Sequence, residues 1–464
     1  MQTATAVRPA PKALALPVVG SLPLLMALGP LEFYRRMWRQ HGDVFRVNLG
    51  ARNAVVVVHP DGIEHVLGSG RENYVKAEAY DLIRMLTGDG LLTLEGEAWR
   101  SRRRLENPAF HRESIHRFVG EMSTIARESL GAWRWRIPNG GTVDIHHEMM
   151  RVTLEIVAST LFGQRLGEDA SDTSGSAFAD ALALVSERGN ALVQLPLTVP
   201  TPGNLRFKKA LATLDRQVYS VIEKARRAQR EGAEQKVPTL LSMLLTARDA
   251  DTGKQLTDKE LRDEVITLFL AGHETTALLM TWGFVLLSKH PEVVAKMRDE
   301  VDRVVGDREV TAADVQQLTY VRRVIDEILR VRSPVWCTAR DAAAADSIQG
   351  FAVEKGDVVM PMFFLTHQHP EFWTKPEEFD PDRFSPERSK GRHHWSYLPF
   401  SMGPRICIGN VFSLTEGALL FATLLQKIEW SMDDTDVVAE PTITLRPKGE
   451  VPVRIRWREK KSSA

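Results

Sequence analysis

The sequence predicts a mainly α-helical protein with small β-sheets, that is, an α+β fold in which helices dominate. Two observations lead to this prediction. Helical patterning with short polar loops continues through residues 99–305, and short strand-like runs occur towards the two ends of the chain. Because no Ser/Gly-rich spacer or internal repeat divides the 464 residues, we expect one large domain over residues 31–464. A flexible, Pro-containing lead-in over residues 1–30 would precede it.

The charge balance and the cysteine content exclude several classes of protein. The chain has 60 Lys and Arg against 60 Asp and Glu, whereas a dedicated nucleic-acid binder normally carries a basic excess. Its hydrophobic fraction of 43% is too high for a disordered chain. Its two cysteines, Cys337 and Cys407, fit neither a disulfide framework nor a Cys-x-x-Cys zinc site. We therefore expect a cytoplasmic globular protein that binds no nucleic acid.

The first apolar stretch, residues 13–29, is the candidate for a membrane segment. A spanning helix needs about 20 consecutive apolar residues, and Pro17, Gly20 and Pro23 interrupt this shorter stretch. No small-residue cleavage site follows a short apolar core, which argues against a secretory signal. We predict no transmembrane segment, and we keep peripheral membrane contact as the alternative.

Four short runs have the composition of β-strands. Residues 44–49 and 54–59, the second with four consecutive valines, predict a small sheet near the start of the chain. Residues 348–361 and 442–457 predict strands that return near the end.

One predicted helix is unusually long. Thr257 and Glu260 form a capping box at its start, and Pro291 prevents simple continuation at its end. The 34 residues 257–290 would extend about 50 Å. The middle reads AGHETT (residues 271–276), with a helix-weakening glycine and hydroxyls that can bond backwards to carbonyls. From the helix alone, a kink with a satisfied polar cluster explains this motif at least as well as a reactive site.

A second helix, predicted over residues 319–331, carries Glu327 and Arg330. The i,i+3 spacing places both side chains on one face, where they can pair. Taken by itself, the pair is typical of an exposed helix surface, where it contributes under about 1 kcal/mol.

The run FSMGPRICIG (residues 400–409) is a glycine-punctuated loop that leads into an apolar helix over residues 411–428. Cys407 therefore lies near a helix N-terminus, where free N–H groups and the positive dipole end favour a thiolate. Such a thiolate could act as a nucleophile, a redox thiol or a metal ligand, although no second cysteine lies nearby for disulfide exchange. An axial thiolate on haem iron fits the loop, because electron donation from sulfur favours O–O cleavage.

These motifs resemble those of the cytochrome P450 superfamily. The cysteine loop matches the family's haem-binding signature, Phe-x-x-Gly-x-Arg-x-Cys-x-Gly, at every specified position. Residues 271–276 match its oxygen-activation motif, and residues 327–330 match its Glu-x-x-Arg pair. PDRF (residues 381–384) and WRSRR (residues 99–103) match two further motifs. The five motifs occur in the family's order, so the resemblance covers nearly the whole chain.

The resemblance implies a cytochrome P450-like domain with haem b as its cofactor. The haem would be enclosed between the long helix and the helix that follows the cysteine loop. Cys407 would be the axial thiolate ligand of the iron. The other haem-binding residues that the resemblance implies, among them donors for the two propionates, are Trp99, Arg103, Ala271, Gly272, Arg340, Phe400, Gly403, Arg405 and Gly409.

The resemblance also assigns roles to the polar motifs. Thr275 would hydrogen-bond the bound dioxygen and Glu274 would relay protons to it. Glu327, Arg330 and Arg383 would form a buried charge network, which replaces the surface interpretation of the ion pair. An apolar substrate pocket would be lined by Leu268, Val335, Trp336 and Ile443.

The implied activity is that of a haem-thiolate monooxygenase, which inserts one oxygen atom of O2 into an apolar organic substrate, with lipids and terpenoids favoured. Electrons would come from a separate partner, either ferredoxin with its reductase or a flavodoxin-type donor. We expect a monomer in which Arg100, Arg102 and Arg104 face solvent or this partner. Two alternatives are kept. One is a family member that rearranges its substrate or uses peroxide, which Glu274 and Thr275 disfavour; the other is a haem-binding sensor or carrier without turnover.

Overall fold

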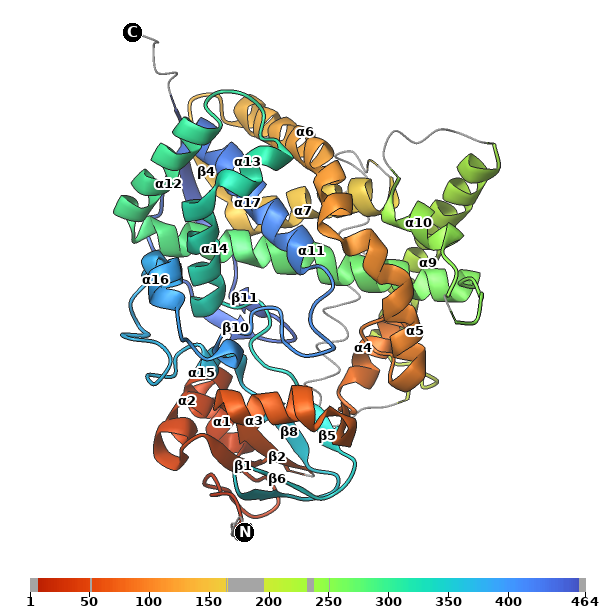
Figure 1. Cartoon of the computed structure of the whole chain (residues 1–464), viewed down its shortest axis with the longest axis vertical. Helices are drawn as coiled ribbons and strands as arrows, with labels where there is room; N and C mark the ends of the chain where they lie inside the picture. The colour runs from red at the N-terminus through yellow and green to blue at the C-terminus, as the bar shows by residue number, and fades with distance from the viewer. Residues whose placement is uncertain are drawn as a thin grey trace. The chain divides into compact units, whose positions relative to one another are not determined.

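The computed structural model divides the chain into two units, whose elements are labelled in Figure 1. Unit 1 comprises residues 1–80, 326–407 and 440–446, and unit 2 comprises residues 81–325, 408–439 and 447–464. The structure describes residues 7–50, 52–163, 165, 196–231, 238–249 and 251–458. The first six residues of the expected lead-in lie outside this part of the chain. The expectation of a single domain over residues 31–464 stays a prediction.

Unit 1 is built around a mixed five-stranded sheet. The strands of this unit are β1 (Val44–Asn48), β2 (Asn53–Val57), β3 (Tyr74–Lys76), β5 (Arg340–Ala342), β6 (Asp346–Ile348), β7 (Phe351–Val353) and β8 (Val358–Pro361). The sheet has the order β1-β2-β8-β5-β3, and β6 and β7 form a separate hairpin. The valine-rich run is β2, which pairs antiparallel with β1 and parallel with β8. Because β2 lies inside the sheet, Val55, Val56 and Val57 are fully buried.

Short helices complete unit 1. They are α1 (Leu22–Leu28), α2 (Pro30–His41), α3 (Pro60–Glu64), α15 (Phe363–Thr366) and α16 (Pro386–Ser389), with helical turns η1 (His65–Ser69), η2 (Arg71–Asn73), η4 (Pro381–Phe384) and η5 (His394–Ser396). Strands β10 (Ala439–Pro441) and β11 (Leu445–Pro447) form a two-stranded sheet. The chain before α1 follows β1, since Arg46 N donates to Pro11 O at 2.7 Å and Ala13 N donates to Arg46 O at 2.8 Å.

Unit 2 is mainly helical. Its elements are α4 (Tyr80–Thr87), α5 (Gly96–Glu106), η3 (Asn107–Phe110), α6 (Arg112–Arg136), β4 (Gly141–Asp144), α7 (Ile145–Phe162), α9 (Pro202–Arg230), α10 (Leu240–Thr246), α11 (Asp258–Ser288), α12 (Pro291–Val304), α13 (Ala312–Gln317), α14 (Thr319–Val331, whose last residues belong to unit 1), α17 (Asn410–Lys427), β9 (Ile428–Ser431) and β12 (Pro452–Trp457). Helix α11 packs against α7, α9 and α17 (Figure 1).

The predicted long helix is α11, and its start follows the sequence. Thr257 accepts from the N–H of Glu260, and the Glu260 carboxylate accepts from the N–H of Thr257, so the capping box is present. The helix ends at Ser288, two residues before the predicted end, because Lys289 and His290 donate to carbonyls three residues back in a tighter final turn.

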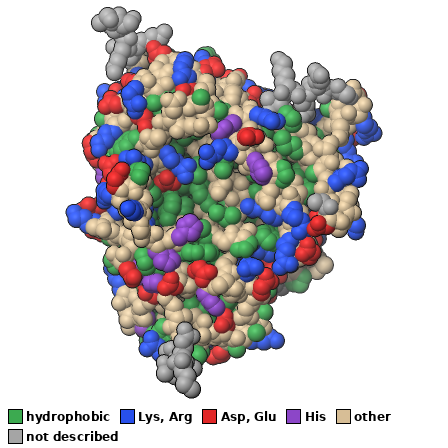
Figure 2. Space-filling model, viewed as in Figure 1, with side chains coloured by type: hydrophobic (Ala, Val, Ile, Leu, Met, Phe, Trp, Pro, Cys, Tyr) green, Lys and Arg blue, Asp and Glu red, His purple; other side chains and the backbone are tan. Residues whose placement is uncertain are grey.

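The stretch that we predicted to be mainly helical also contains a strand. Strand β4 pairs antiparallel with β12, which lies about 300 residues later in the chain, in a sheet of order β4-β12-β9. On the face shown in Figure 2, basic and acidic side chains are interspersed, in keeping with the zero net charge.

Candidate active site

The cysteine loop, in unit 1, is fixed by its own backbone. The N–H of Cys407 donates to the carbonyl of Phe400 at 2.9 Å. Gly403 has a φ of +74°, and a Cβ at this position would lie 2.4 Å from the carbonyl oxygen of Leu67, so only glycine fits. The side chain of Cys407 is exposed, three residues before Asn410 begins α17. The loop therefore presents an accessible thiol next to a helix start.

The second cysteine has a different environment. Cys337 is half-buried and forms no disulfide with Cys407. Burial raises the pKa of its thiol to about 12, so Cys337 stays a neutral thiol at ordinary pH. The environment of Cys337 therefore does not favour a thiolate.

The buried Arg340 and the half-buried Lys76 form a cationic cluster around Tyr80 in unit 1. Within the described chain, the Arg340 guanidinium donates to uncharged oxygens, Thr338 Oγ1 at 2.9 Å and Ala339 O at 2.8 Å. Lys76 Nζ lies 4.1 Å from the Tyr80 ring centroid. Burial by itself would raise the pKa of Tyr80, but the charges of Lys76 and Arg340 lower it to about 7. Since this buried guanidinium has no carboxylate partner within the described residues, it suits an anion such as a haem propionate.

Glu327, Arg330 and Arg383 meet in a buried charge network of unit 1. Arg330 donates to both carboxylate oxygens of Glu327 at 2.8 Å, and Arg383 Nε donates to one of them at 3.0 Å. None of the three side chains is more than 3% exposed. The other guanidinium hydrogens bind the main-chain carbonyls of His367, Thr374, Lys375, Pro376 and Glu378. Two cations thus share one carboxylate, and carbonyl dipoles balance the excess charge.

The predicted pocket residues of unit 1 differ in exposure. Trp336 is buried, and its Nε1 donates to the carbonyl of Thr442 at 3.0 Å. Val335 is half-buried, whereas Ile443 is 41% exposed. The indole hydrogen bond therefore fixes Trp336 beside the segment that carries Ile443.

The AGHETT segment lies within α11 of unit 2. Thr275 Oγ1 donates back to the carbonyl of Ala271 at 2.7 Å, which is the i,i−4 bond that a mid-helix threonine favours. Glu274 is only 3% exposed. A Cβ on Gly272 would lie 3.1 Å from Val157 Cγ2 of α7, so the glycine permits close packing of the two helices.

A buried carboxyl group on α17 was not singled out by the sequence analysis. Glu416 is completely buried, and neither of its oxygens has a hydrogen-bond partner of ordinary geometry within the described residues. Burial raises its pKa well above the ordinary value, which favours the neutral acid. One turn earlier, Ser413 Oγ accepts from Thr276 of α11 at 3.1 Å. The sequence feature that could have indicated Glu416 is an acidic residue inside an otherwise apolar helix.

The expectation that Arg102 faces solvent or a partner is wrong. Arg102 is 6% exposed and forms ion pairs with Glu264, which is completely buried, and with Glu260 at 3.1 Å. Both partners belong to α11, about 160 residues away in sequence, so no local pattern indicates them. Arg100 and Arg104 are exposed, as expected.

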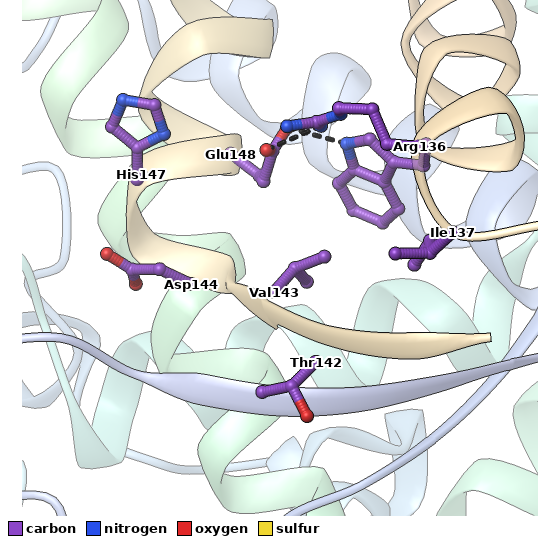
Figure 3. Close-up of a pocket in the computed structure, with 8 residues that line it drawn as sticks. Arg136, Ile137, Thr142, Val143, Asp144, His147 and Glu148 are labelled. Atoms are coloured by element: carbon purple, nitrogen blue, oxygen red, sulfur yellow. Dashed lines mark hydrogen bonds and ion pairs between the residues drawn. The ribbon is translucent and has the colours of Figure 1, made fainter.

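A cavity of about 250 Å³ lies in unit 2 (Figure 3). Glu148 accepts from Trp133 Nε1 and from Arg136, each at 2.6 Å, and Asp144 caps α7 through the N–H of His146. The two carboxylates that line the cavity therefore already have hydrogen-bond partners within the protein. None of the predicted site residues lines the cavity. The lining residues are Trp133, Arg136, Ile137, Thr142, Val143, Asp144, His147 and Glu148.

The predicted haem, oxygen and substrate residues are divided between the two units. Unit 1 carries Val335, Trp336, Arg340, Phe400, Gly403, Arg405, Cys407 and Ile443. Unit 2 carries Trp99, Arg103, Leu268, Ala271, Gly272, Glu274, Thr275 and Gly409. Trp99 and Arg103 lie four residues apart on α5, and both are half-buried.

Comparison with known proteins identifies the family. The cytochrome P450 family model matches residues 9–451, so the chain belongs to the cytochrome P450 family. It is 35% identical over 413 residues to the cyclooctat-9-en-7-ol 5-monooxygenase of Streptomyces melanosporofaciens, covering 88% of each chain. It is 33% identical over 433 residues to the pentalenene oxygenase of Streptomyces avermitilis, covering 93% of this chain and 92% of the relative.

A solved structure supports the same assignment. The crystal structure of the cytochrome P450DA heme domain matches with a TM-score of 0.88 and 29% identity, over 98% of this chain and 99% of that one. The family resemblance and the predicted fold class are therefore confirmed. The chain is a cytochrome P450 monooxygenase, an oxidoreductase of a haem-thiolate family that acts on a hydrophobic substrate.

Proposed function

We propose that Cys407 is the axial thiolate of haem b and that the enzyme, a cytoplasmic monomer, inserts one oxygen atom of O2 into a terpenoid. The observation that carries the proposal is the cysteine loop, where the close approach of Gly403 to Leu67 and the bond from Cys407 N to Phe400 O hold an exposed thiol at the start of α17. The reaction balances as R–H + O2 + two electrons + two protons giving R–OH + H2O.

Basic side chains of this chain would hold the propionates. Arg340 is the best supported, because it is buried and its side chain has no carboxylate partner within the described chain. Trp99, Arg103 and Arg405 are the further proposed donors. Phe400, Ala271, Gly272 and Gly409 would contact the haem. When bound, a haem thiolate supplies the reductive activation of O2.

Thr275 and Glu274 would handle the two protons. The hydroxyl hydrogen of Thr275 is committed to the carbonyl of Ala271, so the lone pairs of Oγ1 can accept a hydrogen bond from a protonated group. Glu274, the preceding residue, is a buried acid that can take up and release a proton. This arrangement favours O2 activation over a rearrangement or a peroxide-dependent reaction.

The two cysteines offer a matched test of the ligand. The CO difference spectrum of the reduced enzyme should show thiolate-ligated haem in the wild type and in Cys337→Ser, and should lose that signature in Cys407→Ser. An unchanged spectrum in Cys407→Ser would contradict the assignment. A normal spectrum without product formation would instead support the sensor or carrier alternative.

The relatives that oxidise cyclooctat-9-en-7-ol and pentalenene support a terpenoid substrate. The apolar side chains of Leu268, Val335, Trp336 and Ile443 are the proposed lining. Titration of the haem absorption with pentalenene, cyclooctat-9-en-7-ol and lauric acid tests this choice. A spectral shift with the fatty acid alone would contradict it.

We also propose a separate electron donor, either ferredoxin with its reductase or a flavodoxin. Consumption of NADPH and O2, coupled to product, should require such a donor. The exposed Arg100 and Arg104 are the proposed docking cations, although both lie 3.4 Å from the carboxylate of Glu97 and Arg104 lies 2.8 Å from that of Asp251. Donor binding should weaken as salt increases, and salt-independent binding would exclude electrostatic docking.

A further inference from the structure

Three histidines of unit 1 share one hydrogen-bonding arrangement. In each, Nδ1 accepts the backbone N–H of the residue two positions later in the chain, at 3.2 Å for His59, 3.3 Å for His369 and 3.2 Å for His393. Such a bond closes a short turn of the kind that an Asn or Asp side chain makes. A ring nitrogen that accepts a hydrogen bond carries no proton, so each turn requires a neutral imidazole.

The other ring nitrogen, Nε2, faces a carboxylate in each of the three histidines. The partners of His59, His369 and His393 are, in that order, Glu371 at 3.7 Å, Asp43 at 3.2 Å and Asp61 at 3.0 Å. Asp61 also lies 3.6 Å from Nδ1 of His59. Because Glu371 and Asp61 are 62% and 64% exposed, water screens much of their attraction for a positively charged ring. These carboxylates therefore compensate only in part for the turn that a protonated ring would lose.

The three imidazole rings gather around one aromatic ring, that of Phe372. Its centroid lies 5.2, 5.0 and 5.6 Å from those of His59, His369 and His393, and the His59 and His369 centroids are 5.7 Å apart. We call these three histidines and Phe372 the histidine cluster. Protonation would turn three acceptors of backbone N–H groups into donors and would place like charges next to one another.

Two of the turns lie next to the cysteine loop. His59 caps α3, which continues into η1, and the carbonyl of Leu67 in η1 is the group that closely approaches Gly403. His393 caps η5, and a Cβ on Gly403 would lie 3.4 Å from the ring of Trp395 in η5. Helix α3 also packs against η5. The segments that contact the cysteine loop are thus held by turns that need neutral imidazoles.

A fourth histidine of unit 1 is kept neutral in a different way. Nε2 of His367 accepts the N–H of Leu398 at 2.8 Å, again as a neutral acceptor. His367 is completely buried, and burial together with the charge of Arg330 lowers its pKa to about 3. The side chains of His59 and His393 are 15% and 32% exposed, so protons from water can reach them. The histidine cluster is therefore open to a change of pH to which His367 does not respond.

Histidine is the side chain that ordinarily changes its charge between about pH 5 and pH 8. We propose that the histidine cluster is an acid-sensitive support of the cysteine loop, whose turns are closed while the imidazoles are neutral and open when they take up protons. Open turns would loosen the contacts of Leu67 and Trp395 with Gly403, and so weaken the hold on Cys407. This last consequence rests on the proposed ligand role of Cys407, whereas the opening of the turns does not.

Hydrogen exchange of the haem-loaded enzyme, followed by mass spectrometry from about pH 8 to about pH 5, tests the opening of the turns. In peptides that cover residues 59–71 and 393–403, the protection factor, that is, the exchange rate corrected for base catalysis, should fall by about tenfold or more towards acid pH. In the triple variant His59→Asn, His369→Asn and His393→Asn it should stay constant. Asparagine closes the same turn through an amide oxygen that does not titrate.

His394→Asn is the matched control, because His394 is exposed and directly follows His393; it should behave like the wild type. The reduced CO spectrum is the second measurement. Its thiolate signature should decline towards acid pH in the wild type and in His394→Asn, but persist in the triple variant.

The two measurements separate the possible failures. Protection factors of the wild type that do not change with pH would overturn the proposal without any variant, and so would an equal fall in the wild type and the triple variant. Turns that open while the thiolate signature of the wild type persists would overturn the support of the cysteine loop. Exchange that depends on pH as expected, in an enzyme that shows no thiolate ligand at any pH, would support the acid-sensitive turns and contradict the proposed role of Cys407.

Discussion

Replacing Glu106 by glutamine tests whether a buried carboxyl pair makes the protein less stable as the pH rises. Glu106 on α5 and Glu264 on α11 are both completely buried, with Arg102 as the cation between them. Arg102 pairs with Glu264, whereas the oxygens of Glu106 have no hydrogen-bond partner of ordinary geometry within the described residues. Burial and the neighbouring charge of Glu264 raise the pKa of Glu106 well above its ordinary value, and burial also raises the pKa of Glu264.

The direction of the effect follows from proton linkage. A carboxyl group whose pKa is higher in the folded chain keeps a proton that the unfolded chain releases above about pH 4.3. The free energy of unfolding therefore falls as the pH rises above that value, by about 1.4 kcal/mol per pH unit for one retained proton, until the folded pair itself ionises. In Glu106→Gln the amide cannot ionise. The variant should match the wild type in acid and become more stable than it towards alkaline pH.

Urea unfolding from about pH 5 to about pH 8 measures this difference. Glu97→Gln is the matched control, because Glu97 belongs to the same helix and its side chain is 67% exposed. A second readout comes from Leu91, whose N–H donates to Glu264 at 3.1 Å. The protection factor of the Leu91 amide, that is, its exchange rate corrected for base catalysis, should fall towards alkaline pH in the wild type but stay constant in Glu106→Gln. Parallel stability curves for the wild type and Glu106→Gln would refute the reasoning, and so would an equal change in Glu97→Gln.

Three further predictions concern unit 1. Glu327→Gln leaves two buried guanidinium groups without their carboxylate, so it should lower the free energy of unfolding by about 3–5 kcal/mol, and an unchanged urea midpoint would contradict the network. Gly403→Ala should reduce both thermal stability and haem retention, whereas Gly356→Ala, with a φ of +85° but no atom within 4 Å of the new Cβ, should cost only the backbone strain of about 1–3 kcal/mol. Equal effects of Gly403→Ala and Gly356→Ala would exclude the close contact with the Leu67 carbonyl as the cause. In the haem-free protein, ultraviolet titration should show one tyrosinate that forms near pH 7 and is absent in Tyr80→Phe. Titration of every tyrosine near the ordinary value of about 10 would contradict the cationic cluster.

Much of the fold was predictable where local patterns decide the structure. The start of α11 follows from a capping box of four residues, and α14 and α17 agree to within one residue with the helices predicted over residues 319–331 and 411–428. Strand β4 could not be predicted in this way, because its partner β12 lies about 300 residues later and supplies the hydrogen bonds that make it a strand. Arg102 is a similar case: its row of neighbouring arginines suggested an exposed helix face, and only the packing of α5 against α11 supplies the carboxylates that bury it.

The candidate site shows the same difference between local sequence patterns and long-range packing. The motifs that contain Cys407, Glu274 and Thr275 are contiguous in sequence, so the family resemblance could assign them. The cluster of Lys76 and Tyr80 with Arg340 is assembled by the pairing of β3 with β5, and no motif contains all three residues. The electrostatic environment of a proposed propionate donor is therefore a property of the fold rather than of a motif.

The buried acids of this protein show why a residue type alone does not define its chemistry. Glu327 faces two guanidinium groups, Glu106 shares one cation with a second carboxylate, and Glu416 has no ion-pair partner within the described chain. The number of cations that long-range packing supplies differs at each position, so the same substitution should have three outcomes. Glutamine should destabilise the protein at position 327, stabilise it at alkaline pH at position 106, and leave it nearly unchanged at position 416, where a neutral amide replaces an acid whose pKa burial raises well above the ordinary value. Urea unfolding of the three variants near pH 7 would contradict this account if Glu416→Gln were as destabilising as Glu327→Gln, because position 416 would then require a charge that the structure does not balance.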